Sequence, residues 1–400
     1  MTTTLAAVQH STSHSTSHTD TTPYFTQDHA MLRETLQRFI RDRVLPFADQ
    51  WEIDGFVPRV VLQEMGALGL LGIRYAEEFG GSALDTLATV VLAEELGRST
   101  YGGFAVTVLV HTDMASPHLH HAGTQAQREK YLPDIIAGKK IAAVAMTEAD
   151  AGSDLAGMKT TARRDGDDYV LNGAKMYITN GVLGDVFFVA AKTGGPGAGH
   201  KAISMFIVEK DTPGFSVARP LKKTGWLSSD TAELVFDECR IPAGNLLGEE
   251  NRGFYSLMKN LQNERIVLAA QAMGEASKAI ELTLQWVTQR KAFGATLWDK
   301  QTIRHRLAMH CAKIEAARQL IYNTAWRDTQ GHMLTKEVSM IKALCGELVN
   351  EVMYDCVQFH GGMGYMREAA IERMSRDARI QSIGGGATEV MLEEIAKKLV

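Results

Sequence analysis

The sequence predicts a multidomain α+β protein that is mainly helical and carries one β-domain in the middle of the chain. Hydrophobic residues recur at helical spacing before residue 140 and after residue 248, whereas between 141 and 247 their spacing is close to two. The 400 residues, 45% of them hydrophobic, suffice for two or three substantial cores. We predict four parts: a disordered tail (1–23), an N-terminal helical domain (24–140), a β-barrel or sandwich (141–247) and a C-terminal four-helix bundle (248–400).

The first two parts differ sharply in composition. In the tail, Ser-Thr-Ser-His occurs twice in succession, and such a low-complexity segment cannot bury enough apolar surface to order itself. After it, apolar residues follow the helical period, and Pro46 ends the first such segment. The expected helices are 31–44, 58–68, 85–96 and 125–136.

Turn residues punctuate the central part at short intervals. Asp165-Gly166-Asp167 predicts a hairpin between strands 160–164 and 169–172, and Asn172-Gly173 predicts a second turn into strand 175–179. The glycine-rich segment 194–199 predicts a flexible loop. The remaining expected strands are 141–146, 186–191, 202–208 and 233–236.

Long amphipathic segments with short connections occupy the last part and predict a bundle. They span 253–290, 300–330, 334–360 and 387–398.

Composition excludes several classes of function. The net charge of −5, with no basic run, gives no reason to expect nucleic acid. The longest apolar stretches, 65–73 and 101–110, are shorter than the roughly 20 residues that a membrane helix needs. The four cysteines form no C-x-x-C pair, so we expect no metal site and no disulfide framework. Without a signal segment at the N-terminus, we expect a cytoplasmic protein.

One carboxylate lies within an apolar helical stripe. Leu257, Leu261, Glu264 and Leu268 are separated by four, three and four residues, which places all four on one helix face. A buried charge is costly unless it is paired, neutralised or functional. The pattern alone leaves two interpretations open: an ion pair with Arg265, or a functional carboxylate with a perturbed pKa.

Two further segments could cradle a ligand. Residues 146–154 place hydroxyls, small residues and free backbone amides directly after an expected buried strand. Residues 358–365 contain three glycines, which permit close approach of a flat or charged group. Read alone, each could equally be an ordinary capped loop or a helix-ending turn. No strand–GxGxxG–helix unit, Walker motif or G-x-S-x-G elbow occurs.

Taken together, these segments resemble the acyl-CoA dehydrogenase family from about residue 24 to the C-terminus. The family fold is a helical domain, a β-barrel domain and a four-helix bundle, in agreement with the division above. The matching motifs are AMTEADAGSD (145–154), KMYITNG (175–181), RKAFG (290–294) with Gln301, QFHGGMGY (358–365), RDAR (376–379) and GGGATE (384–389).

The resemblance implies an FAD site that is shared between neighbouring subunits, and hence an obligate oligomer, in this family usually a tetramer. Tyr177 would pack on the isoalloxazine ring, with Thr179 near its reactive edge. The implied cofactor contacts are Met146, Thr147, Gly152, Ser153, Tyr177, Thr179, Arg290, Phe293, Gln301, Gln358, Gly361, Gly362, Thr388 and Glu389.

Gly385 departs from the pattern of many relatives, which carry the catalytic glutamate at this position. The long-chain and isovaleryl subgroups instead place the base on the long bundle helix, in a Glu-Arg pair that matches Glu264-Arg265. The resemblance therefore implies Glu264 as the base and the Gly385 N–H as a donor to the thioester carbonyl. Ser153, Leu261, Arg265 and Gly385 are the implied substrate contacts.

The implied reaction is α,β-dehydrogenation of an acyl-CoA with a medium, long or branched chain. Glu264 would remove the α-proton while the β-carbon gives hydride to FAD, and an electron-transferring flavoprotein would accept the electrons. Burial should raise the pKa of Glu264 toward neutrality. We also expect a glutamate at position 385 to restore some activity to Glu264→Gln. The alternatives are a flavin oxidase or monooxygenase on the same fold, and a flavin-binding paralogue without activity.

Overall fold

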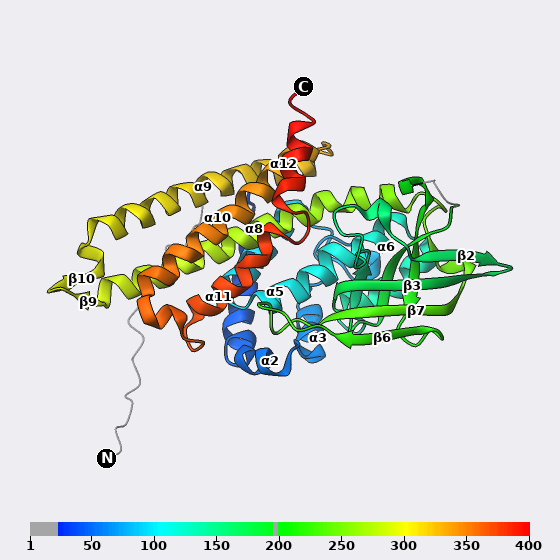
Figure 1. Cartoon of the computed structure of the whole chain (residues 1–400), viewed down its shortest axis with the longest axis horizontal. Helices are drawn as coiled ribbons and strands as arrows, with labels where there is room; N and C mark the ends of the chain where they lie inside the picture. The colour runs from blue at the N-terminus through cyan, green and yellow to red at the C-terminus, as the bar shows by residue number, and fades with distance from the viewer. Residues whose placement is uncertain (1–22, 195–198) are drawn as a thin grey trace, which may run out of the picture.

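The computed structural model describes residues 23–194 and 199–400. Residues 1–22 of the predicted tail and 195–198 of the predicted 194–199 loop lie outside these residues. In Figure 1 the long helices α8, α9 and α10 extend to one end of the molecule and the β-sheet occupies the other. The expected fold class, mainly α with a central β region and C-terminal helices, is confirmed.

Helices and single helical turns form the first part of the chain. They are α1 (Gln27–Phe39), η1 (Ile40–Val44), α2 (Ala48–Asp54), α3 (Arg59–Ala67), η2 (Glu77–Phe79), α4 (Thr86–Arg98), α5 (Gly102–Leu109), η3 (Val110–Ala115), α6 (Ser116–Ala122) and α7 (Gln125–Ile136). The η3 segment is π-helical, and Pro117 follows it in the first turn of α6.

Eight strands in the middle of the chain form one sheet with the order β6-β7-β3-β2-β4-β5-β8, and β1 pairs with β4 in parallel. Side chains from six of these strands enclose a core separate from that of the helices. The strands are β1 (Ala142–Ala145), β2 (Thr161–Asp165), β3 (Asp168–Thr179), β4 (Val186–Lys192), β5 (Ile203–Glu209), β6 (Phe215–Pro220), β7 (Thr231–Pro242) and β8 (Leu246–Leu247).

The predicted turn at Asn172-Gly173 is wrong. Strand β3 continues through both residues, and its register against β7 shifts between Leu171 and Gly173. Gly173 has φ +148, and a Cβ there would meet Thr160, so the glycine permits both the bulge against β7 and the close approach of Thr160.

The last part of the chain begins with α8 (Gly253–Gln289), which packs against both α4 and α10. At the α4–α8 crossing, a Cβ on Gly97 or Gly274 would collide with backbone atoms of the other helix, so these glycines allow close approach. The other elements are β9 (Lys291–Ala292), β10 (Ala295–Thr296), α9 (Gln301–Thr329), α10 (Thr335–His360), η8 (Gly361–Tyr365), α11 (Ala370–Ala378), η9 (Arg379–Ser382) and α12 (Thr388–Ala396). Within the described residues, every helix is too short or too polar to cross a bilayer.

Candidate active site

Glu264 is buried on α8, with 4% of its surface exposed. Burial raises its pKa to about 7, and Asp113 adds to the rise, while Asn260 and Arg265 oppose it. The amide of Asn260, one helical turn earlier, donates a hydrogen bond of 2.9 Å to Glu264 Oε1. The apolar stripe therefore does bury this carboxylate, and its proton affinity suits exchange near neutral pH.

Arg265 does not neutralise Glu264 by a direct ion pair. Its influence on Glu264 is a longer-range charge interaction, and within the described residues its Nε makes no hydrogen bond. The guanidinium lies toward the loop before α12, where a Cβ on Gly386 would be 3.7 Å from Arg265 Nε. Adjacent side chains on a helix diverge by about 100°, which accounts for this separation.

The loop that carries Gly385 approaches α8 one turn beyond Glu264. Gly385 has φ +66, and a Cβ there would overlap the Cδ1 methyl of Leu268. The buried Lys342 of α10 fixes both ends of the loop, since its Nζ donates to Gln381 O at 2.6 Å and to Gly386 O at 3.1 Å. Burial, and after it the charge of Arg265, lower the pKa of Lys342 to about 8.

The segment after β1 is held against β3. Lys175 is fully buried, and its Nζ donates to Met146 O at 3.0 Å and to Glu148 Oε1 at 2.7 Å. Thr147 O accepts the backbone N–H of Met176 at 2.8 Å. Gly152 and Ser153 follow on the exposed side, where only Thr147 lies within 4 Å of a Cβ placed on Gly152. The predicted cradle is thus an exposed loop whose first residues, Met146–Glu148, are hydrogen-bonded to β3.

Tyr177 and Thr179 lie near the end of β3. Tyr177 adopts φ +62 at a register shift between Lys175 and Ile178, and 66% of its surface is exposed. This conformation is costly for an aromatic residue. Thr179 is half-buried and pairs with Thr231 of β7. Together with the 146–153 segment, these residues form one cluster on the β-sheet part of the molecule.

The second cluster of predicted cofactor residues lies at the far end of the bundle. Arg290 ends α8, Phe293 lies at the tip of the β9–β10 hairpin with 97% of its surface exposed, and Gln301 begins α9. Gln358 is exposed near the end of α10, and nothing approaches within 4 Å of a Cβ placed on Gly361 or Gly362. Figure 1 shows the hairpin and the β-sheet at opposite ends of the molecule. One chain therefore does not bring the two clusters together.

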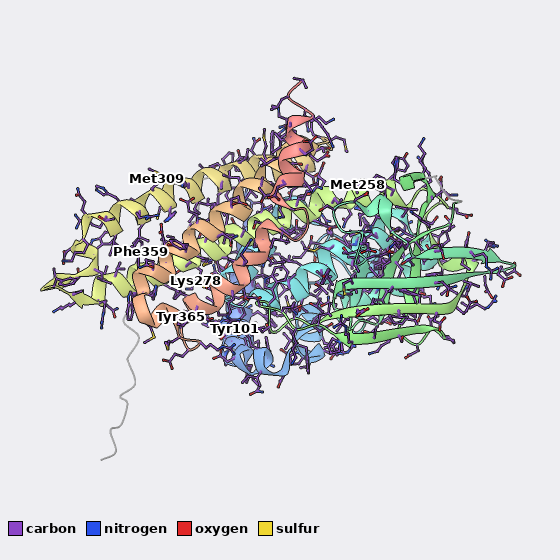
Figure 2. The ribbon with its side chains drawn as sticks, in the orientation of Figure 1. Tyr101, Met258, Lys278, Met309, Phe359 and Tyr365 are labelled. Carbon is purple, nitrogen blue, oxygen red and sulfur yellow. The ribbon has the colours of Figure 1, made fainter. Side chains whose placement is uncertain are left out.

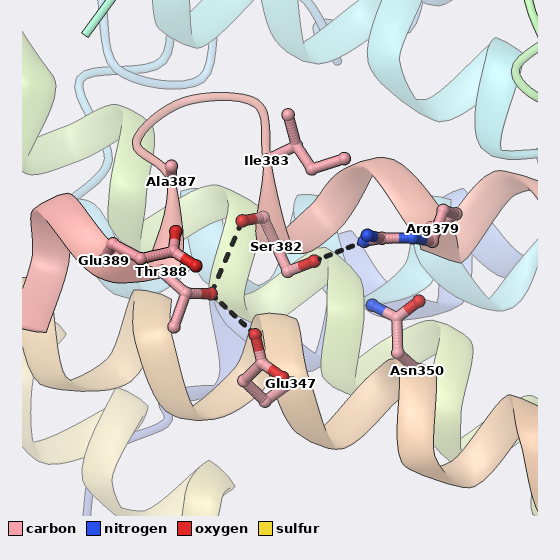
Figure 3. Close-up of a pocket in the computed structure, with 8 residues that line it drawn as sticks. All are labelled: Glu347, Asn350, Arg379, Ser382, Ile383, Ala387, Thr388 and Glu389. Carbon is pink, nitrogen blue, oxygen red and sulfur yellow. Dashed lines mark hydrogen bonds between the residues drawn. The ribbon is translucent and has the colours of Figure 1, made fainter.

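Thr388 and Glu389 line a pocket of about 400 Å³ between α10 and the loop before α12 (Figure 3). Thr388 Oγ1 donates to Glu347 Oε1 at 2.7 Å, and Arg379 Nη1 donates to Ser382 Oγ at 2.8 Å. The sequence patterns did not indicate Glu347, although it bonds directly to one of the predicted residues.

These surfaces fit a large flat cofactor with an anionic tail. An exposed aromatic ring in a strained conformation, open glycine turns and a terminal arginine provide a stacking face and close contacts to a charged chain. The same chain carries a buried carboxylate with a raised pKa, Glu264 on α8. A helical fold with a central β-sheet and surfaces of these kinds is typical of a flavoprotein oxidoreductase.

Comparisons with known proteins give the family. Family models named acyl-CoA dehydrogenase N-terminal, middle and C-terminal domain match residues 26–139, 143–239 and 251–400. The mitochondrial long-chain specific acyl-CoA dehydrogenase of Mus musculus is 42% identical over 94% of this chain and 87% of its own length. The mitochondrial isovaleryl-CoA dehydrogenase of Pongo abelii is 36% identical over 91% of this chain and 86% of its own. An acyl-CoA dehydrogenase structure from Geobacillus kaustophilus superposes with a TM-score of 0.92, at 40% identity over 94% of this chain and 99% of its own.

The chain belongs to the acyl-CoA dehydrogenase family. Its members are FAD-binding flavoproteins, so the predicted cofactor and enzyme class are confirmed, and the reaction is FAD-dependent dehydrogenation of an acyl-CoA. The roles of the individual residues remain predictions, as do the domain boundaries.

The raised pKa of Glu264 predicts a measurable effect on stability. Because the pKa is about 7 in the folded chain and about 4.3 in the unfolded chain, folding becomes less favourable as pH rises between these values, by roughly 3–4 kcal/mol in all. We expect Glu264→Gln to raise the Tm of the FAD-loaded protein at pH 8, with the gain shrinking toward pH 5. An equal gain at both pH values, measured by scanning calorimetry, would contradict the raised pKa.

Proposed function

We propose that Glu264 is the base that removes the α-proton of a medium-, long- or branched-chain acyl-CoA, giving the trans-2-enoyl product. The observation that carries this proposal is the burial of Glu264 in an apolar stripe, with a pKa of about 7, beside the loop of Gly385. A thioester α-proton is a very weak acid, so the base needs a high proton affinity, and the carbonyl needs a donor as charge develops. The backbone N–H of Gly385, on an exposed loop that Lys342 fixes, is the proposed donor from the chain.

Bound FAD would supply the hydride acceptor for the β-carbon. Tyr177 and Thr179 are proposed to hold its ring against the segment formed by Met146, Thr147, Gly152 and Ser153. Leu261 and Arg265 are half-buried on the side of α8 next to Glu264, and we propose that they contact the substrate together with Ser153. The greater identity to the long-chain relative than to the isovaleryl relative supports the longer acyl chain.

We further propose a homo-oligomer, a tetramer as the family resemblance implies. The two cofactor clusters lie at opposite ends of one chain, so a single FAD can contact both only if a second copy supplies Arg290, Phe293, Gln301, Gln358, Gly361 and Gly362. Exposed apolar side chains on the bundle support an interface there. They include Met309 on α9 and Tyr365 after α10, which are 57% and 81% exposed (Figure 2).

Anaerobic flavin bleaching tests the proposed substrate. We expect the flavin absorbance of the purified holoenzyme to fall on mixing with acyl-CoAs, fastest for long or branched chains, because the proposed base lies within an apolar stripe of α8. Glu264→Gln with the same panel is the control. Failure of every acyl-CoA to bleach a fully loaded flavin would overturn the proposal.

The same samples discriminate the oxidase alternative. When air is admitted to the bleached enzyme, a dehydrogenase should recover its absorbance slowly, and an electron-transferring flavoprotein should speed the recovery. Immediate recovery with stoichiometric hydrogen peroxide would instead identify an oxidase.

A further inference from the structure

Asn260 occupies an unusual position between the proposed base and a π-helical turn. Its Nδ2 donates to Glu264 Oε1 at 2.9 Å and also lies 3.2 Å from Asp113 O and 3.1 Å from Met114 O. The side chain is 1% exposed. Reversing the amide would bring its oxygen against three acceptors, so these neighbours fix the orientation in which Nδ2 faces Glu264.

At Asp113 O, one backbone donor of a regular helix is missing for a local reason. In a regular helix the backbone N–H of Pro117 would donate to Asp113 O, but proline has no N–H. The π-helical turn η3 ends at this point, and its Asp113 O accepts from both Asn260 Nδ2 at 3.2 Å and Asn263 Nδ2 at 3.0 Å. Two asparagines of α8 therefore bind one carbonyl, and only Asn260 also reaches Glu264.

We propose that Asn260 is a positioning residue for the reaction: it holds the Glu264 carboxylate in its ionised form and at a fixed place against η3. The proposal rests on Glu264 acting as the base. The bond is charge-assisted, so it favours the carboxylate over the carboxylic acid and limits the effect of burial. Asn260 can orient Glu264 because the carbonyls of Asp113 and Met114 in η3 fix the side-chain amide of Asn260.

The other charged groups around Glu264 do not form this bond. Asp113 on η3 raises the pKa of Glu264, and Arg265 on α8 lowers it through space. Lys342 of α10 lies beyond Arg265 and interacts with its charge. Arg74 bonds to Asn263 and not to Glu264 within the described residues, from its Nη2 to Asn263 Oδ1 at 2.9 Å.

The test compares Asn260→Leu with Asn263→Leu, a matched control that also removes an α8 bond to Asp113 O. The readout is the rate of anaerobic flavin reduction by saturating acyl-CoA in the holoenzyme between pH 6 and 9.5. We expect Asn260→Leu to move the acid limb of the pH–rate profile upward by about one pH unit and to lower the rate at pH 7 by about fivefold, with recovery at high pH. Asn263→Leu should leave the limb in place.

Three outcomes decide the matter. If the acid limb of Asn260→Leu stays at the wild-type pH, Asn260 has no positioning role toward Glu264. The same conclusion follows if Asn260→Leu and Asn263→Leu shift the acid limb equally. If Glu264→Gln, measured alongside, reduces its flavin at the normal rate, the proposed base itself is wrong. Should Asn260→Leu not load flavin, Asn260→Ser takes its place, because its hydroxyl is too short to reach Glu264 and the same upward shift is expected.

Discussion

Glu264→Gln should load FAD normally and lose flavin reduction by acyl-CoA by about 10³-fold or more, within the range that general bases contribute. Glutamine has almost the same shape as glutamate and can still accept the bond from Asn260 Nδ2, so the fold around it should persist. What it lacks is the ability to take a proton. Stopped-flow flavin reduction under anaerobic conditions measures the loss directly, without the later transfer of electrons to an acceptor.

The same helix offers a matched control in Glu275→Gln. Glu275 is also fully buried on α8, and burial raises its pKa to about 8. Its carboxyl is held by Gln271 Nε2 at 2.8 Å and Gln381 Nε2 at 3.3 Å, eleven positions beyond Glu264. Because Glu275 is largely protonated at neutral pH, an amide there should preserve activity. Equal loss in both variants would mean that Glu264 acts through the packing of α8 and not as the base.

The contrast between these two glutamates shows what a pattern in the sequence can and cannot predict. The spacing of Leu257, Leu261, Glu264 and Leu268 was enough to predict a buried carboxylate, because helix periodicity is local information. The partner of that carboxylate was not predictable in the same way. Asn260 gains its place through η3, more than 140 residues earlier in the chain, and only the packed structure brings the two together.

The fold shows the same limit. Periodicity predicted the long helices α8, α9 and α10, but not β6 or α11. Strand β6 has mostly exposed side chains, and its apolar alternation is limited to Phe215 and Val217, too short to predict a strand. At Asn172-Gly173 a local turn signal was overridden by pairing with strands on both sides, which converts the glycine into a bulge. The two clusters of cofactor residues were identifiable only by resemblance, since no local rule links segments at opposite ends of a molecule.

Moving the base to position 385 should fail, contrary to what the sequence alone led us to expect. In the Glu264→Gln background, Gly385→Glu should give no recovery of flavin reduction. Gly385 has φ +66, which costs a residue with a side chain about 1–2 kcal/mol, and its Cβ would overlap the Cδ1 methyl of Leu268. Leu268 is 4% exposed, so it has little room to move aside.

Shortening Leu268 separates these two obstacles. We expect Glu264→Gln/Leu268→Ala/Gly385→Glu to reduce its flavin about tenfold faster than Glu264→Gln/Leu268→Ala, because the methyl that blocks the new Cβ is gone while the left-handed backbone penalty remains. Flavin content and anaerobic bleaching rates measure this gain in four variants: Glu264→Gln, Glu264→Gln/Gly385→Glu, Glu264→Gln/Leu268→Ala and the triple variant. Recovery in Glu264→Gln/Gly385→Glu with Leu268 intact would show that the loop moves away from α8 more easily than the bonds of Lys342 to Gln381 O and Gly386 O allow. Leu268 would then not be what prevents a carboxylate at position 385 from acting as the base.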